Sequence, residues 1–222
     1  MSSPTHVSSA GRSGRTSSAA RLSDSRAVVP EGVAAPDSVP ADVFAAAVDS
    51  WVSGQRLDMQ GLARKLGVGR ATLYRRAGNR EQLLDEVLWW RGRHALVDAV
   101  QRTAQLCGVP RLVALVNTLL TAIHNDRPLR AFLESDPEAA LRILTGTRST
   151  VQQGMIHALE RAIDLEIDRG QFATDLDTPT LAYAIVRITE GFLYSDIIAD
   201  RTPDIERGTA VIEALLRGLN TA

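Results

Sequence analysis

The sequence predicts an all-α protein, and three observations lead to this prediction. From Pro40 onward, apolar side chains recur at spacings of three and four residues, and no segment shows the alternation of a half-buried strand. Several prolines sit where a first helical turn would begin. Residues that cap helices precede many of the apolar segments. We therefore expect helices near 41–53, 58–66, 70–76, 79–106, 110–125, 128–134, 137–145, 147–169, 179–200 and 203–219.

The segment 58–76 predicts two short helices joined by a tight turn. Asp58 is a suitable N-cap, because its carboxylate accepts from free backbone N–H groups of a first turn. Gly67 supplies the left-handed conformation that ends the first helix without a Cβ penalty. Leu73 faces inward on the second helix, whereas short and cationic side chains lie on its outer face. A helix with such a face suits the major groove of DNA, so the segment indicates a helix-turn-helix.

Helices on both sides complete this unit. The helix expected at 41–53 carries one apolar face that ends at Trp51 and would pack across the helix-turn-helix. The sequence Asn79-Arg80-Glu81-Gln82 forms a capping box at the start of a long helix that would link two domains. We expect a DNA-binding domain at 37–84 and a second helical domain at 85–222.

Residues 58–84 resemble the DNA-binding domain of the TetR family of bacterial transcription regulators. The resemblance is carried by Leu62-Ala63, Leu66-Gly67-Val68, Arg70-Ala71-Thr72-Leu73-Tyr74 and Asn79-Arg80-Glu81-Gln82-Leu83-Leu84. The family usually has Ser or Thr where Gly69 stands, Phe where Ala77 stands and Lys where Arg80 stands. Trp51 is expected to fill the space beside Ala77. Tyr74 to Arg80 and the C-terminal layout are also similar to the quorum-signal-degradation regulators of actinobacteria, which implies a lactone or acyl-chain signal.

Residue roles on DNA follow from side-chain chemistry. Arg prefers guanine O6 and N7, and the Ala or Thr methyl suits a thymine methyl. The candidates for base edges are Gln60, Arg70, Ala71, Thr72 and Arg75. Tyr74 is expected to donate to a backbone phosphate. Arg80 would bind phosphate at the N-terminus of its helix, where the helix dipole also favours an anion.

The formal net charge of −1 hides a strong asymmetry along the 222 residues. Between Arg56 and Arg93 there are nine basic and four acidic residues, so this segment has a net charge of +5 and the C-terminal part is acidic. This distribution is typical of a DNA-binding protein with a separate domain that does not touch DNA. Residues 1–36 are rich in Ser, Ala, Pro and Arg and predict a disordered basic arm. Arg12, Arg15, Arg21 and Arg26 would either contact DNA or belong to a tail without function.

The composition also limits the cellular compartment and the kinds of partner that we expect. Apolar runs are too short for a transmembrane helix, so no membrane partner is expected. The single Cys107 excludes an intrachain disulfide and fits a reducing cytoplasm. No cofactor or metal is expected.

The second domain offers candidates for a ligand pocket. Asn117, Thr121 and His124 form a polar stripe on an otherwise apolar helix, and this stripe faces either a ligand or solvent. Further candidates are Trp89, Trp90, Phe132, Met155, Leu159, Phe172, Tyr183, Arg187 and Glu190.

The last two expected helices indicate an assembly surface. The segment 180–198 is apolar around most of its circumference, so it must be buried on several sides. In the family, the last two helices pair with their copies in a dimer, which assigns Ile185, Ile188, Phe192, Ile212, Leu215, Leu216 and Leu219 to the interface. The alternative is that both helices only fill the monomer core.

Together these features predict a homodimeric, ligand-responsive transcription regulator. It would repress by binding double-stranded operator DNA, and a small, largely apolar effector would release it. A ligand-independent architectural DNA-binding protein is the alternative. An enzyme is not expected, because the sequence has no phosphate-binding loop, zinc-spaced Cys–His pair or nucleophile elbow, and His157 with Glu160 alone does not make a di-iron site.

Overall fold

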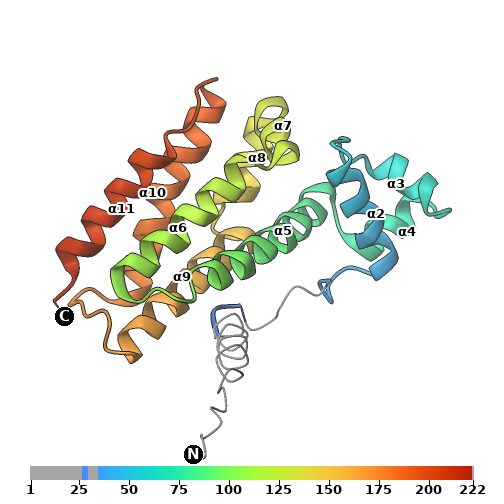
Figure 1. The fold of residues 1–222 in the computed structure, drawn as a ribbon. Coiled ribbons are helices and arrows are strands. Elements are labelled where there is room, and N and C mark those ends of the chain that lie inside the picture. The colour runs from blue at the N-terminus through green and yellow to red at the C-terminus, as the bar shows by residue number, and fades with distance from the viewer. Residues whose placement is uncertain (1–26, 30–34, 222) are drawn as a thin grey trace, which may run out of the picture.

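The computed structural model describes residues 27–29 and 35–221, and these ranges contain helices without strands. Figure 1 shows a small group of helices at one end and a larger bundle at the other, joined by α5. The small group contains α2 (Ala41–Val52), α3 (Met59–Lys65) and α4 (Arg70–Ala77). The bundle contains α6 (Gly108–His124), α7 (Arg127–Ser135), α8 (Pro137–Thr145), α9 (Thr150–Asp168), α10 (Thr178–Ile198) and α11 (Ile205–Leu219). The connecting helix is α5 (Arg80–Arg102). The all-α prediction is confirmed.

The predicted N-caps of α3 and α5 form the expected hydrogen bonds. The Asp58 carboxylate accepts from the N–H groups of Gln60 (3.0 Å) and Gly61 (2.7 Å) at the start of α3. At the start of α5, Asn79 Oδ1 accepts from Gln82 N at 2.9 Å, and Gln82 Oε1 accepts from Asn79 N at 2.8 Å. Gly67 ends α3 with φ of 66°, in the left-handed region. These local features determine where α3 begins and ends and where α5 begins.

The helix boundaries depart from the predictions around α5 and α6. Helix α5 ends at Arg102, and α6 begins at Gly108, two residues before Pro110. The buried carboxylate of Glu166 accepts from Gly108 N (2.6 Å) and pairs with Arg111 (2.6 Å). This long-range contact satisfies a free N–H at the helix start, which local sequence does not reveal. Similarly, Asp177 and Asp204 cap α10 and α11, so Pro203 lies outside α11.

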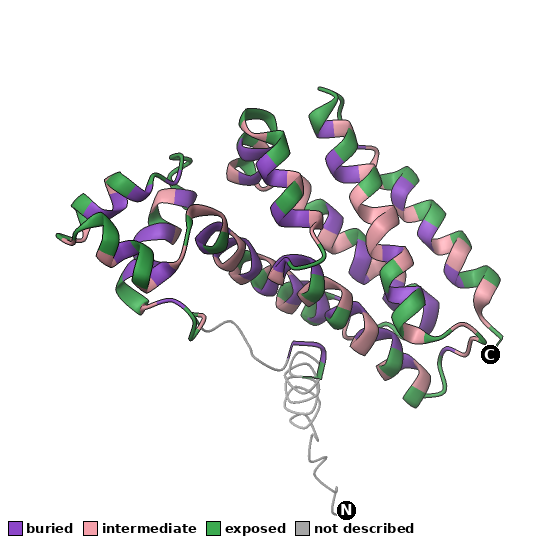
Figure 2. Ribbon diagram, turned by 180° about the vertical axis from the view of Figure 1, so that it is seen from behind, coloured by how far each residue is buried: buried purple, intermediate pink, exposed green. Residues whose placement is uncertain are grey.

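Buried residues face the centre of both helix groups, and exposed residues cover their outer sides (Figure 2). Val28 and Val29 are also buried, and Arg161 Nε of α9 donates to Val28 O at 2.8 Å. Residues 27–29 therefore pack on the C-terminal bundle, which corrects the expectation of a disordered arm for this short segment. Arg12, Arg15, Arg21 and Arg26 lie outside the described residues. Within the described part of the chain, no helix is long and apolar enough to cross a membrane.

Candidate DNA-binding face and effector cavity

One face of α3 and α4 is open to solvent and carries most of the predicted DNA contacts. Leu73 is fully buried and anchors α4 on the small helix group. The exposed side chains around it are those of Gln60, Arg70, Ala71, Tyr74 and Arg75, and Thr72 is partly buried beside them. Tyr74 keeps 39% of its surface exposed, although it is a large aromatic residue. The face therefore combines cationic, aromatic and small side chains, which are residue types that can contact base edges and phosphates in a major groove.

Two other basic residues of this region are tied to α2 by ion pairs. Arg76 is 2.7 Å from Asp42, and Lys65 is 3.5 Å from Asp49. The Arg76 hydrogen bond lowers the pKa of the Asp42 carboxyl below its ordinary value. Helix α2 thereby holds the ends of both helices of the helix-turn-helix.

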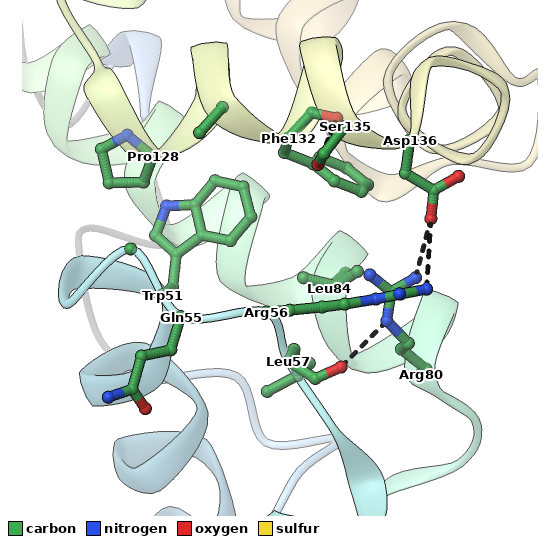
Figure 3. Close-up of a pocket in the computed structure, with 12 residues that line it drawn as sticks. Trp51, Gln55, Arg56, Leu57, Arg80, Leu84, Pro128, Phe132, Ser135 and Asp136 are labelled. Carbon is green, nitrogen blue, oxygen red and sulfur yellow. Dashed lines mark hydrogen bonds and ion pairs between the residues drawn. The ribbon is translucent and has the colours of Figure 1, made fainter.

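Arg80 does not lie with the predicted DNA contacts. Its Nε donates to Leu57 O at 2.9 Å, and its Nη1 is 3.5 Å from Asp136 Oδ2 (Figure 3). Its guanidinium also lies over the Phe132 ring, 5.8 Å from the centroid. The sequence indicates a helix N-terminus here, but the structure turns the side chain towards α7. Arg80 therefore contacts residues of the domain junction in this structure, and its role as a phosphate contact stays a prediction.

The C-terminal bundle contains two adjoining cavities. The first, of about 190 Å³, reaches the surface beside Arg91 and His94 and extends inward to Tyr194. The second, of about 60 Å³, lies deeper between α5, α6, α9 and α10. Both cavities are lined by Ile123, Leu144, Val151, Met155 and Tyr194. The shared lining is mostly aliphatic, so the combined space suits an apolar molecule.

A small polar cluster forms one side of the deeper cavity. Glu190 accepts from Arg187 at 2.8 Å. With the Gln152 amide turned to match its neighbours, its nitrogen donates to Glu190 Oε1 (2.8 Å) and Leu144 O (3.0 Å). Burial raises the pKa of Glu190 above its ordinary value. Burial also raises the pKa of Tyr194, and the nearby Glu190 charge adds to this effect. The cluster gives an otherwise apolar cavity a few hydrogen-bonding groups.

Comparison with known proteins supplies the family. Residues 107–217, half of the chain, match the family model described as the tetracyclin repressor-like C-terminal domain. The chain belongs to the TetR family. TetR-family proteins are DNA-binding transcription regulators, so this chain is a regulator and not an enzyme.

Two solved structures place this TetR-family chain among its relatives. The transcriptional repressor QsdR of R. erythropolis is 26% identical, with a TM-score of 0.72, and the match covers 82% of this chain and 98% of that one. A TetR transcription regulator from Haloarcula marismortui is 19% identical, with a TM-score of 0.50 and coverage of 81% and 97%, and shows the shared fold. No curated protein matches the chain.

The cavities contain some of the predicted ligand-binding residues and not others. Met155, Leu159 and Glu190 line them. The Asn117–Thr121–His124 stripe lies outside them, and Asn117 Oδ1 accepts from Thr209 of α11 at 3.1 Å. Asn117 therefore faces α11 and Thr121 is exposed, whereas His124 is partly buried and its Nδ1 lies 3.1 Å from Arg130 Nη2 of α7. Tyr194 and Gln152 were missed, because a Tyr and a Gln on mostly apolar helices are no distinctive signal.

The other aromatic candidates have separate locations. Trp89 lines a cavity of about 300 Å³ beside Val29 and α9, and Trp90 packs edge-to-face on Phe44 of α2. Phe172 is core, and Phe132 lies at the domain junction against Trp51. Trp51 thus packs towards α7, with ring centroids 5.7 Å apart. Tyr183 is 48% exposed on α10, where Arg187 lies over its ring.

The outer surface of α10 and α11 differs from the predicted interface. Ile185, Ile212 and Leu216 are fully buried inside the monomer, so they are not available to a partner. Ile188, Phe192, Leu215 and Leu219 are partly buried, and Phe192 packs on Gly208 between the two helices. The large apolar side chains exposed on these helices are Tyr183, Ile198 and Val211. The apolar side chains that α10 and α11 leave wholly or partly exposed therefore include Tyr183, Ile198 and Val211 with Ile188, Phe192, Leu215 and Leu219.

Proposed function

We propose that this TetR-family chain is a homodimeric repressor that leaves its operator when a small, largely apolar effector binds in the C-terminal cavities. The observation that carries the proposal is the position of α5. This helix begins in the DNA-binding group at Arg80 and lines the cavities with Leu88, Arg91, Gly92, Ala95 and Leu96. A ligand that fits the cavities better in one position of α5 would favour that position, and α3 and α4 would follow.

The proposed effector is an acyl chain or a lactone. The cavity walls are aliphatic, and the charge of Glu190 is already paired with Arg187. The exposed polar mouth at Arg91 and His94 would leave a head group near water, while a chain enters between the helices. The similarity to QsdR supports a repressor, since that protein is described as one.

The proposed dimer pairs α10 and α11 of two copies. The exposed large apolar side chains Tyr183, Ile198 and Val211 lie on these two helices, together with the partly exposed Ile188, Phe192, Leu215 and Leu219. Two copies would place two α4 helices about 34–36 Å apart, one turn of DNA. Arg70, Ala71, Thr72 and Arg75, with Gln60, would read bases, and Tyr74 would contact a phosphate.

A release experiment tests the effector proposal. The protein first selects its operator from a random duplex library, and fluorescence anisotropy then follows the complex during titration with γ-lactones and fatty acids of increasing chain length. We expect release by members of one length range. The variant Val186→Phe fills the deeper cavity and should bind DNA but resist release. Val113→Phe is the matched control, because Val113 is a partly buried valine of α6 that lines neither cavity.

Two results would contradict the proposal. Equal release of the wild type and Val186→Phe would place the effector elsewhere. Tight DNA binding that no apolar ligand changes would favour the ligand-independent architectural protein.

A further inference from the structure

A further cavity lies between the DNA-binding end and the bundle, and it shares no lining residue with the two apolar cavities. It has a volume of about 320 Å³, within the range of about 300–1,000 Å³ that ligand sites occupy. Its walls come from the end of α2, the connection 53–57, the start of α5 and one side of α7 (Figure 3). We refer to this cavity as the junction cleft.

The charged side of the junction cleft has more hydrogen-bond donors than acceptors. Arg56 and Arg80 both point to the single carboxylate of Asp136, at 4.0 Å and 3.5 Å. Both distances are long for charge-assisted hydrogen bonds, which are about 2.7–2.9 Å. The Arg56 side chain is 80% exposed. Two guanidinium groups, each with five N–H donors, therefore share one weakly held carboxylate, and the site has a formal charge of +1.

Asp136 is placed to act as an internal occupant of this anion site. It stands at the N-cap of α8, yet its side chain makes no capping hydrogen bond there. Its carboxylate is instead turned to the two arginines (Figure 3). An external carboxylate could replace it with planar, bidentate contacts, which Arg favours.

The other side of the junction cleft is apolar and aromatic. Trp51 and Phe132 meet edge-to-face at 5.7 Å, and Leu84, Pro128 and Ala131 complete the wall. Trp51 is 5% exposed, and its Nε1 is buried without a partner among the described residues. That atom lies on the ring edge facing Pro128 (Figure 3). A buried donor without an acceptor is unfavourable, so a ligand oxygen that reaches this atom when the cleft opens slightly would be favoured.

We propose that the junction cleft binds a small organic anion of the aryl or short alkyl carboxylate class. Arg56 and Arg80 hold its carboxylate in place of Asp136, and its apolar body lies against Trp51 and Phe132. Because the walls belong to both helix groups, such a ligand stabilises one arrangement of the DNA-binding end relative to the bundle. Binding itself does not rest on the proposed function, whereas its effect on operator affinity does.

Calorimetric titration of the full chain with benzoate tests the site, and neutral benzamide serves as the uncharged probe. We expect saturable binding of benzoate and at least tenfold weaker binding of benzamide. Arg56→Gln should weaken benzoate binding about tenfold, the loss expected for a charge-assisted contact. Arg217→Gln is the matched control, because Arg217 is a similarly exposed, ion-paired arginine on α11. Asp136→Asn should tighten benzoate binding several-fold, since it removes the competing carboxylate.

The remaining outcomes would overturn the assignment. They are the absence of saturable benzoate binding, equal binding of benzoate and benzamide, and benzoate binding that Arg56→Gln and Asp136→Asn leave unchanged. In the last case, loss of binding in Val186→Phe would locate the anion in the apolar cavities. If benzoate binds as expected but operator affinity does not change, the site stands and its coupling to DNA binding fails.

Discussion

Arg75 and Arg76 are neighbours on α4 but have different environments. Arg75 is exposed on the face that carries Arg70 and Ala71, whereas Arg76 pairs with Asp42 at 2.7 Å. We predict that Arg75→Ala relaxes discrimination at one operator base pair by roughly 1–3 kcal/mol. Arg76→Ala should change affinity for all operator variants by one common factor. Anisotropy titrations of both variants against single-base-pair operator substitutions check this, and a uniform loss for Arg75→Ala would exclude base reading.

The Asp58 cap should make the free energy of unfolding depend on pH. The N–H groups of Gln60 and Gly61 hold the pKa of this carboxyl below its ordinary value of 3.8. The folded pKa is the lower one, so the cap stabilises the fold above the unfolded pKa and loses this effect as pH falls through the folded pKa. Asn caps helices without ionising. Urea titrations should therefore show that the free energy of unfolding of the wild type falls relative to that of Asp58→Asn below about pH 4. A constant difference across pH would contradict the account.

Single residues show where sequence reasoning reaches its limit. Asp58, Gly67 and Asn79 have the predicted roles because capping depends on residues a few positions away. The contacts of Arg80 and Trp51 could not be predicted, because Asp136 lies between α7 and α8 and Phe132 lies on α7, far along the chain from both residues. Local spacing carries no information about such partners.

At the scale of elements, α4 starts without a side-chain cap. Gly69 is its N-cap, with φ of −70° and ψ of 150°, a conformation open to any L-residue. A Cβ there meets nothing within 4 Å. We predict that Gly69→Ser raises the free energy of unfolding by about 0.4–1 kcal/mol, through a less flexible unfolded chain and a new cap.

Gly67→Ser is the matched control for this prediction. Its Cβ also meets nothing within 4 Å, but its φ is 66°. The left-handed conformation should cost roughly 1–2 kcal/mol. Chemical denaturation measures both variants, and stabilisation by Gly67→Ser, or destabilisation by Gly69→Ser, would contradict the backbone argument.

Helical periodicity predicts where the helices lie along the chain better than it predicts what each face of a helix packs against. The segment 180–198 was recognised as buried on several sides, and α10 is. Which sides face the monomer and which face a partner depends on α9 and α11 packing, so Ile185 and Ile212 were assigned to a partner although they belong to the monomer core. The Asn117 stripe shows the same limit, because α11 approaches it from a distant part of the chain.

At the scale of the whole molecule, the proposed dimer has a direct test. Val211 is 42% exposed on α11, so Val211→Glu should place a charge in the interface without disturbing the monomer core. We predict monomers by light scattering and at least tenfold weaker operator binding. Val52→Glu is the matched control, because Val52 is a 57% exposed valine at the end of α2. Intact dimers of Val211→Glu would reject this surface.

Sequence-specific DNA binding by the α3–α4 face is the central claim, and a competition titration tests it most directly. The selected operator, fluorescently labelled, is titrated with the wild type and with Tyr74→Ala in excess random-sequence DNA. We predict tight, saturable binding of two protomers per duplex, and a weaker Tyr74→Ala that loses affinity for operator and random DNA alike. Two results would contradict the claim. One is wild-type binding that random DNA abolishes, and the other is full operator affinity in both single variants, Tyr74→Ala and Arg75→Ala.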